Sequence, residues 1–428
     1  MIKYIFITGY NNKINKSIFI AFLISLLEEN NLKITIKKIS EFKSFKTFIT
    51  NNGLELDFEM GYYERYCNII INEINNILTT NIDKMVEFIK SDSDKYDIVF
   101  IDMDNIYYNV IKYFKKEYIN IHFISSKTPK SFFIKSDIII KEKDCDKLYN
   151  NLYKIPYILY NSYLYNTILE LYNITQPLTK WENIYNKIDI YIKIINIFII
   201  IKFTKSYISL YDSLNHAAYF LKIKLNIYFI NPKKITKEEL KYILNKYKGG
   251  IIVPGGMGDI GFKNKIEAIR IARENNIPLL GICYGMQIMC IEFAKNVLNI
   301  TKACTQEIDS LKNYIHIVHS IEPNEENIKK RLGNFDVKIK KDSLAYDICK
   351  TNIVNERHRH KYKINKEYIN EFECYGLKIT GMSLDNVYVE IVEYPKNDFY
   401  IGIQYHPELK STIFKPHPIF IRYLESLI

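Results

Sequence analysis

The stretch "PLLGICYGMQIMCIEFAKNV" (278–297) decides the fold of the second half of the chain. An apolar run ends at Gly281, and the apolar spacing after Met286 is typical of a helix. Cys283 is therefore predicted to lie on a sharp turn between a strand and a helix, where the N-terminus of the helix favours a thiolate. The pattern predicts a cysteine nucleophile; the alternative is a small buried apolar residue, the usual state of a free cysteine.

Strand-like runs alternate with helical stretches along the whole chain, which predicts an α/β protein with parallel sheets. The chain has 428 residues, more than one ordinary core holds, so two domains are expected. We place a first domain over 1–178, a linker over 179–187 and a second domain over 188–428. An apolar helix is expected over 17–28, and one or two buried strands over 190–201.

Composition excludes several classes of protein. The net charge is +11, but the lysines are scattered, so no nucleic-acid partner is expected. The apolar run 190–201 is short and contains Lys193, so no membrane partner is expected. Seven cysteines without a CxxC or CxxxC pair argue against a disulfide framework and against zinc, and for a reducing compartment. We expect a cytoplasmic protein.

Two further motifs supply what a thiol nucleophile needs. In "QYHPE" (404–408), His406 is suited to accept the thiol proton and Glu408 to orient the imidazole. In "IIVPGGMG" (251–258), the N–H of Gly256, with that of Tyr284, is suited to form an oxyanion hole. Taken alone, the histidine would be read as structural and the Pro-Gly-Gly as a turn.

Together these motifs resemble class I glutamine amidotransferases, which have a flavodoxin-like α/β domain. The resemblance implies Cys283 as nucleophile, His406 as general acid/base and Glu408 as its partner. The residues around them, and "IVNERHRHKYKIN" (353–365) and "ACTQE" (303–307), are similar to the CTP synthase version of this domain. That likeness implies a set of residues that bind L-glutamine: Gly256, Tyr284, Gly285, Met286, Gln287, Glu307 and Arg359.

The first domain resembles the P-loop-like amidoligase domain of the same family. The likeness rests on "KYIFITG" (3–9), "GLELDFEMGYYERY" (53–66) and "YDIVFID" (96–102). It implies ATP binding by Lys16, Ser17 and Lys38, and Mg²⁺ binding by Glu59 and Asp102. A phosphate site also needs backbone N–H groups and a lysine at the start of a helix. From the residues alone, "NKINKS" (12–17) is a polar loop.

The first domain departs from the family pattern in several segments. In "TGYNNKINKSI" (8–18), Tyr10 and Asn15 stand where the family has glycines, and Tyr62 stands where it has histidine. The UTP-recognition motif is reduced to "SKTPKS" (126–131), and "MDNIYYN" (103–109) replaces a glycine-rich segment.

The resemblance implies ATP-dependent amination of UTP to CTP with ammonia from glutamine, a homotetramer, and GTP as an allosteric activator. The alternative is a glutaminase or ammonia donor whose first domain is a non-catalytic remnant used for assembly or nucleotide sensing.

Overall fold

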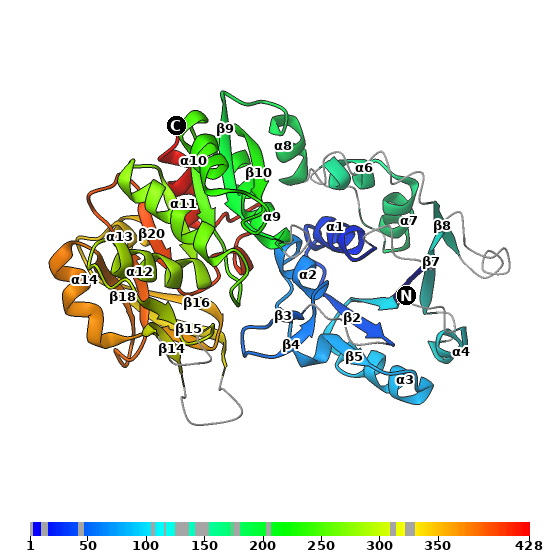
Figure 1. Cartoon of the computed structure of the whole chain (residues 1–428). Helices are drawn as coiled ribbons and strands as arrows, with labels where there is room; N and C mark the ends of the chain where they lie inside the picture. The colour runs from blue at the N-terminus through cyan, green and yellow to red at the C-terminus, as the bar shows by residue number, and fades with distance from the viewer. Residues whose placement is uncertain are drawn as a thin grey trace. The chain divides into compact units, whose positions relative to one another are not determined.

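The computed structural model describes residues 3–9, 16–41, 47–103, 108–114, 117–124, 137–141, 154–172, 174, 180–202, 207–308, 314–321 and 330–428. Two compact units, Met1–Ile190 and Tyr191–Ile428, make up the chain (Figure 1). Both contain a sheet with helices, so the expected α/β class is confirmed. None of the helices in the described ranges has the length and apolar character needed to span a bilayer.

The first unit is built on a parallel sheet of six strands, because its apolar runs pair side by side with helices connecting them. In sheet order the strands are β5 (Asn76–Leu78), β2 (Ile34–Ser40), β6 (Ile98–Met103), β1 (Tyr4–Gly9), β7 (Tyr118–Ile124) and β8 (Ile138–Lys141). A separate hairpin joins β3 (Thr47–Ile49) and β4 (Glu55–Asp57). The described helices are α1 (Lys16–Glu28), α2 (Met60–Tyr66), α3 (Ile82–Lys90), α4 (Tyr108–Ile111), α6 (Ile155–Tyr160), α7 (Tyr163–Leu171) and α8 (Lys180–Lys187).

Helix α1 is buried along almost its whole length, as its apolar sequence predicts. The segment 179–187, which we expected to be a linker, largely forms α8 instead. Trp181 of α8 is fully buried, its ring lies edge-on to Phe22 of α1, and its indole N–H donates to Ser25 Oγ at 3.1 Å. The linker prediction was therefore wrong for residues 180–187, which pack as part of the first unit.

The second unit has a sheet of nine strands that is parallel at one end and antiparallel at the other. In order these are β10 (Ile223–Ile230), β9 (Lys193–Ile200), β11 (Gly250–Val253), β12 (Leu279–Ile282), β20 (Tyr400–Ile403), β19 (Val389–Glu393), β18 (Lys378–Ser383), β15 (Arg331–Ile339) and β16 (Ile353–His360). A small sheet joins β13 (Ala303–Thr305), β14 (Ile315–Ser320) and β17 (Tyr362–Ile364). The run 190–201 thus contributes one strand, β9.

Helices cover this sheet and complete two buried clusters, one on each side of it. They are α9 (Ile208–Leu221), α10 (Lys237–Lys246), α11 (Phe262–Glu274), α12 (Tyr284–Asn296), α13 (Leu344–Cys349), α14 (Ile369–Tyr375) and α15 (Pro418–Glu425). The strands β11, β12 and β20 run parallel and adjacent. The segments that follow their carboxyl ends therefore meet at one edge, and these segments carry "PGG", Cys283 and His406.

Candidate active site

Cys283 occupies a strained turn between β12 and α12, as the sequence predicts. Its backbone has φ 53° and ψ −106°, an unusual conformation for a residue with a side chain. The turn is tight because α12 lies against the end of β11: a Cβ at Gly285 would be 1.8 Å from the Val253 carbonyl oxygen. Only glycine fits there. The Cys283 thiol faces the carbonyl oxygen of Arg359 at 3.8 Å.

His406 lies beside Cys283 and is oriented by Glu408. The imidazole Nδ1 is 2.7 Å from Glu408 Oε1, and both side chains are largely buried. Burial by itself lowers the pKa of His406, but the negative charges of Glu408 and Cys283 outweigh it and raise this pKa from 6.5 to about 10. A Cβ on Gly255 would lie 2.9 Å from His406 Cε1 and 3.7 Å from Cys283 Cβ, so this glycine leaves room for both side chains.

Two tyrosine hydroxyls hold the glycine loop that follows β11. Tyr207 donates to the Gly255 carbonyl oxygen, and Tyr284 donates to the Gly258 carbonyl oxygen. Gly256 lies between these two anchors and is exposed. Anchoring a loop through its carbonyl oxygens leaves the N–H of Gly256 for a ligand, as an oxyanion hole requires. Sequence reasoning missed Tyr207, since no motif marks it.

Glu307, predicted to bind glutamine, lies near this loop with a buried lysine. Burial raises the pKa of Glu307, opposed by a hydrogen bond from the Gly258 backbone and by the charges of Lys361 and Lys265. Burial lowers the pKa of Lys265 to about 8, opposed by Glu307. The Lys265 ammonium lies 5.0 Å from the centre of the Tyr284 ring. Lys265 was not singled out from the sequence, because lysines are usually exposed.

The remaining predicted glutamine-binding residues differ in where their side chains lie. Arg359 is exposed on β16, and its carbonyl oxygen contacts the thiol of Cys283. The Met286 side chain is fully buried, and that of Gln287 donates to the Tyr362 carbonyl oxygen and to Gln404. Met286 and Gln287 therefore present only their backbone to a ligand beside Cys283, at the start of α12.

A second cluster of charged groups lies in the first unit, and it brings together all five residues predicted there. Lys16 Nζ is 2.7 Å from Asp102 Oδ1, while Lys38 Nζ is 2.7 Å from Glu59 Oε2 and 3.3 Å from Asp102 Oδ2. Ser17 Oγ lies 2.8 Å from Glu59 Oε2 and 2.9 Å from Asp102 Oδ2. The residues come from α1, β2, the segment before α2 and β6, so only the fold makes them neighbours.

The two lysines determine the charge state of this cluster. Asp102 is fully buried, which by itself raises its pKa, but the adjacent charges of Lys16 and Lys38 hold the pKa well below its usual value. Tyr63 of α2 donates a further hydrogen bond to Asp102 Oδ2 at 2.8 Å. Sequence reasoning missed Tyr63, although it stands within the quoted "GYYERY". The carboxylate and hydroxyl oxygens converge at one place and are the donor type that Mg²⁺ prefers.

The departures of the first unit fall partly within the described residues. Tyr62, at the position of a family histidine, is buried and stacks on Tyr66, with the Arg65 guanidinium 4.7 Å from its ring centre. It therefore fills space in the core of the unit. Residues 10–15, most of "MDNIYYN" and the whole of "SKTPKS" lie outside the described residues.

Comparison with known proteins assigns both units to one family. Residues 203–426 match the model of glutamine amidotransferase class-I, and residues 3–96 match that of the CTP synthase N-terminus. The CTP synthase of Pelagibacter ubique is 30% identical, and the alignment covers 100% of this chain and 99% of that protein. The chain belongs to the CTP synthase family.

Other relatives agree with this assignment. The CTP synthase of Syntrophus aciditrophicus is 29% identical, with 100% of this chain and 98% of that protein covered. The solved glutaminase domain of Trypanosoma brucei CTP synthase, with bound acivicin, is 30% identical, with a TM-score of 0.51 over 54% of this chain and 93% of that one. The P. ubique alignment runs over 538 positions against 428 residues here, so about 110 positions have no counterpart in this shortened CTP synthase family member.

Proposed function

We propose that this protein is a glutamine-hydrolysing CTP synthase, which aminates UTP to CTP with ATP and with ammonia from glutamine. The observation that carries the proposal is the cluster of Lys16, Lys38, Glu59 and Asp102, in which all but the partly exposed Glu59 are buried. A remnant used only for assembly has no need of two lysines and two carboxylates joined where β2 and β6 meet the start of α1, because buried charges are costly to a fold. The second unit supplies the ammonia.

Glutamine hydrolysis follows from the geometry at Cys283. The sulfur attacks the side-chain amide carbon of glutamine, and His406, held by Glu408, carries the thiol proton to the departing ammonia. The negative oxygen that forms is stabilised by the N–H groups of Gly256 and Tyr284. A water molecule then hydrolyses the γ-glutamyl thioester, with His406 accepting its proton.

Amination takes place in the first unit. Lys16 and Lys38 bind the phosphates of ATP, exchanging their present carboxylate partners for phosphate oxygens. Glu59, Asp102 and the Ser17 hydroxyl would hold Mg²⁺, which neutralises phosphate charge when bound. ATP phosphorylates the 4-oxygen of UTP, and ammonia displaces that phosphate to give CTP.

The test follows CTP directly with UTP, ATP and Mg²⁺ present and either glutamine or ammonium as nitrogen donor. We expect CTP from both donors in the native protein and from ammonium alone in Cys283→Ala. The matched variant Lys38→Met should do the opposite: it should release glutamate from glutamine but form no CTP from either donor. Glutamate without CTP in the native protein would instead support a glutaminase that donates ammonia elsewhere.

Family likeness also leads us to propose a homotetramer in the cytoplasm and activation by GTP. Sedimentation with and without ATP and UTP tests the assembly, and the rate of glutamine-dependent CTP formation against GTP concentration tests the activation. A monomer at all concentrations, or a rate indifferent to GTP, would remove the corresponding proposal.

A further inference from the structure

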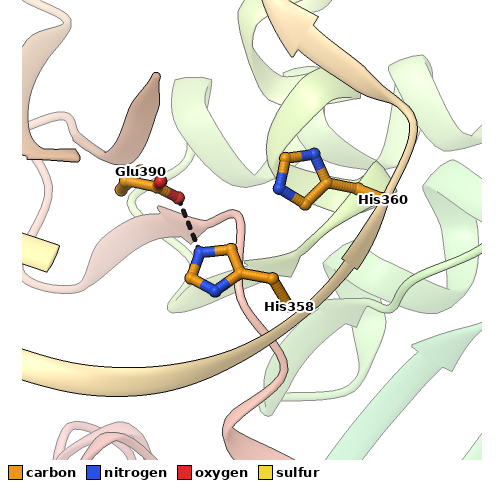
Figure 2. Close-up of side chains that lie close together, drawn as sticks. All are labelled: His358, His360 and Glu390. Carbon is orange, nitrogen blue, oxygen red and sulfur yellow. Dashed lines mark hydrogen bonds and ion pairs between the residues drawn. The ribbon is translucent and has the colours of Figure 1, made fainter. Parts of the chain in front are cut away.

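The second unit contains a buried cluster of two histidines and a glutamate on β16 and β19. Glutamine hydrolysis does not use these three residues. His358 and His360 stand two residues apart on this strand, so their side chains project from the same face. Glu390 of β19 lies opposite them, and all three residues are buried. One ligand-type atom from each lies within 4.8 Å of the others. Figure 2 shows the Nε2 atoms of both rings facing Glu390.

The hydrogen bond made by Nδ1 of each imidazole ring determines whether Nε2, the inner nitrogen that faces Glu390, carries a proton or a lone pair. His358 Nδ1 lies 3.0 Å from the Glu356 carbonyl oxygen, and His360 Nδ1 lies 2.9 Å from the Tyr362 carbonyl oxygen. A carbonyl oxygen only accepts, so each Nδ1 carries the proton. In a neutral ring Nε2 then holds a lone pair, as in histidines that bind metals.

Both inner nitrogens lack a hydrogen-bond donor among the described residues. His358 Nε2 faces Glu390 Oε2 at 2.9 Å, and an ionised carboxylate only accepts. His360 Nε2 is buried without a hydrogen-bond partner. Two lone pairs and a carboxylate therefore point at one another, which is unfavourable unless a positive charge lies between them.

We propose that His358, His360 and Glu390 bind a divalent transition-metal ion of the zinc class. Two imidazole nitrogens and one carboxylate oxygen are a common ligand set for Zn²⁺ and leave a further position open. Ligand atoms about 2.0–2.1 Å from a tetrahedral ion lie roughly 3.3 Å apart, so small side-chain movements would suffice. The expectation against zinc rested on the spacing of the cysteines, and this set contains no cysteine.

Arg331 provides the outer contact of the carboxylate. Its guanidinium donates to Glu390 Oε1, which leaves Oε2 for the ion. Outer partners of this kind orient a ligand carboxylate. The positive charge of Arg331 also opposes the ion, so we expect micromolar rather than picomolar binding.

The site would act on the glutaminase centre through β16. Arg359 stands between the two histidines and projects from the opposite face of the strand, and its carbonyl oxygen contacts the thiol of Cys283. The backbone N–H of His406 donates to the Arg357 carbonyl oxygen at 2.8 Å. An ion bound by His358 and His360 would therefore hold in place the segment of β16 that contacts both Cys283 and His406.

The test measures binding of Zn²⁺ and of Co²⁺ to full-length protein freed of metal by a chelator. We expect one equivalent of each, and for Co²⁺ a visible spectrum without a thiolate charge-transfer band. His360→Ala should lose the equivalent. The matched control His316→Ala, which removes an imidazole on β14, should keep it. Circular dichroism checks that both variants are folded.

The outcomes separate the alternatives. No bound ion in the native protein, or equal binding in His360→Ala, overturns the proposal. If His360→Ala does not fold, anomalous diffraction from Zn²⁺-soaked crystals of the native protein decides. A peak between the three side chains supports the site, and its absence there refutes it. Chelation should also lower kcat for glutamine hydrolysis at least threefold.

Discussion

Replacing Glu408 with glutamine should lower the pKa of His406 and slow glutamine hydrolysis at alkaline pH. The two side chains are 2.7 Å apart at their nearest atoms, and their charges are about 4 Å apart. At an effective dielectric constant of about 20 such charges attract by roughly 4 kcal/mol, or about three pKa units. The amide oxygen of glutamine still accepts the Nδ1 proton, so we expect a fall of roughly one to three units from about 10.

The assay is the pH dependence of glutamate release. The reactive pair needs a protonated His406, so the alkaline limb of the rate profile should move down with its pKa. At pH 9 the rate should then fall by roughly 2-fold for a one-unit shift to roughly 90-fold for a three-unit shift, while CTP formation from ammonium is unchanged. Glu425→Gln, which removes an exposed carboxylate on α15, is the matched control. An alkaline limb that coincides in both variants and the native protein would refute the reasoning.

The same variant affects stability with a defined sign. The pKa of His406 is higher in the folded protein than its ordinary value of 6.5. The stabilisation it gives is therefore fully present below about pH 6.5 and is lost as pH rises through about 10. In Glu408→Gln, the free energy of unfolding of the second unit should change less across this interval.

Three other variants test the packing around the sites. Gly285→Ala places a Cβ 1.8 Å from a backbone oxygen of β11 and should lower the free energy of unfolding by about 3 kcal/mol or more. Gly256→Ala is the control, because its Cβ would meet nothing closer than 3.6 Å. Equal urea midpoints for the two variants would contradict this. Trp181→Phe should destabilise the first unit by about 1–3 kcal/mol in urea, and an unchanged midpoint would show that α8 does not pack there. Tyr63→Phe removes the hydroxyl that donates to Asp102 and should lower the free energy of unfolding of the first unit by about 1.5–3 kcal/mol. An unchanged free energy would mean that this hydrogen bond contributes nothing to stability.

The strand-to-helix turn at Cys283 was predictable because its determinants are local. A buried apolar run, a glycine and a helical spacing lie within 278–297, and the structure places β12, the turn and α12 there. In the first half, the quoted runs 3–9 and 96–102 coincide with β1 and β6 of the sheet. The grouping of Lys38, Glu59 and Asp102 was suggested by family likeness, since charges on separate elements do not reveal their neighbours.

Long-range packing explains what sequence reasoning did not find. The segment 179–187 has a polar composition, but Trp181 finds its partner in α1, 156 residues earlier, and this contact stabilises a helix. His358 and His360 stand at alternating positions in the quoted segment 353–365, which the structure shows to be the strand β16, but no role was predicted for them. Their third partner, Glu390, stands on β19, three strands away from β16 in the sheet order, so spacing alone does not connect it with them.

The backbone of Cys283 has a consequence for how inactive forms of the protein behave. A positive φ with a side chain present is unfavourable by about 1–3 kcal/mol, and glycine relieves it. Cys283→Gly should therefore melt at a higher temperature than Cys283→Ala, although both lack the sulfur. A protein that no longer hydrolyses glutamine would gain stability from the single substitution Cys283→Gly. The thiol at this position is therefore present at a cost of about 1–3 kcal/mol to the stability of the fold.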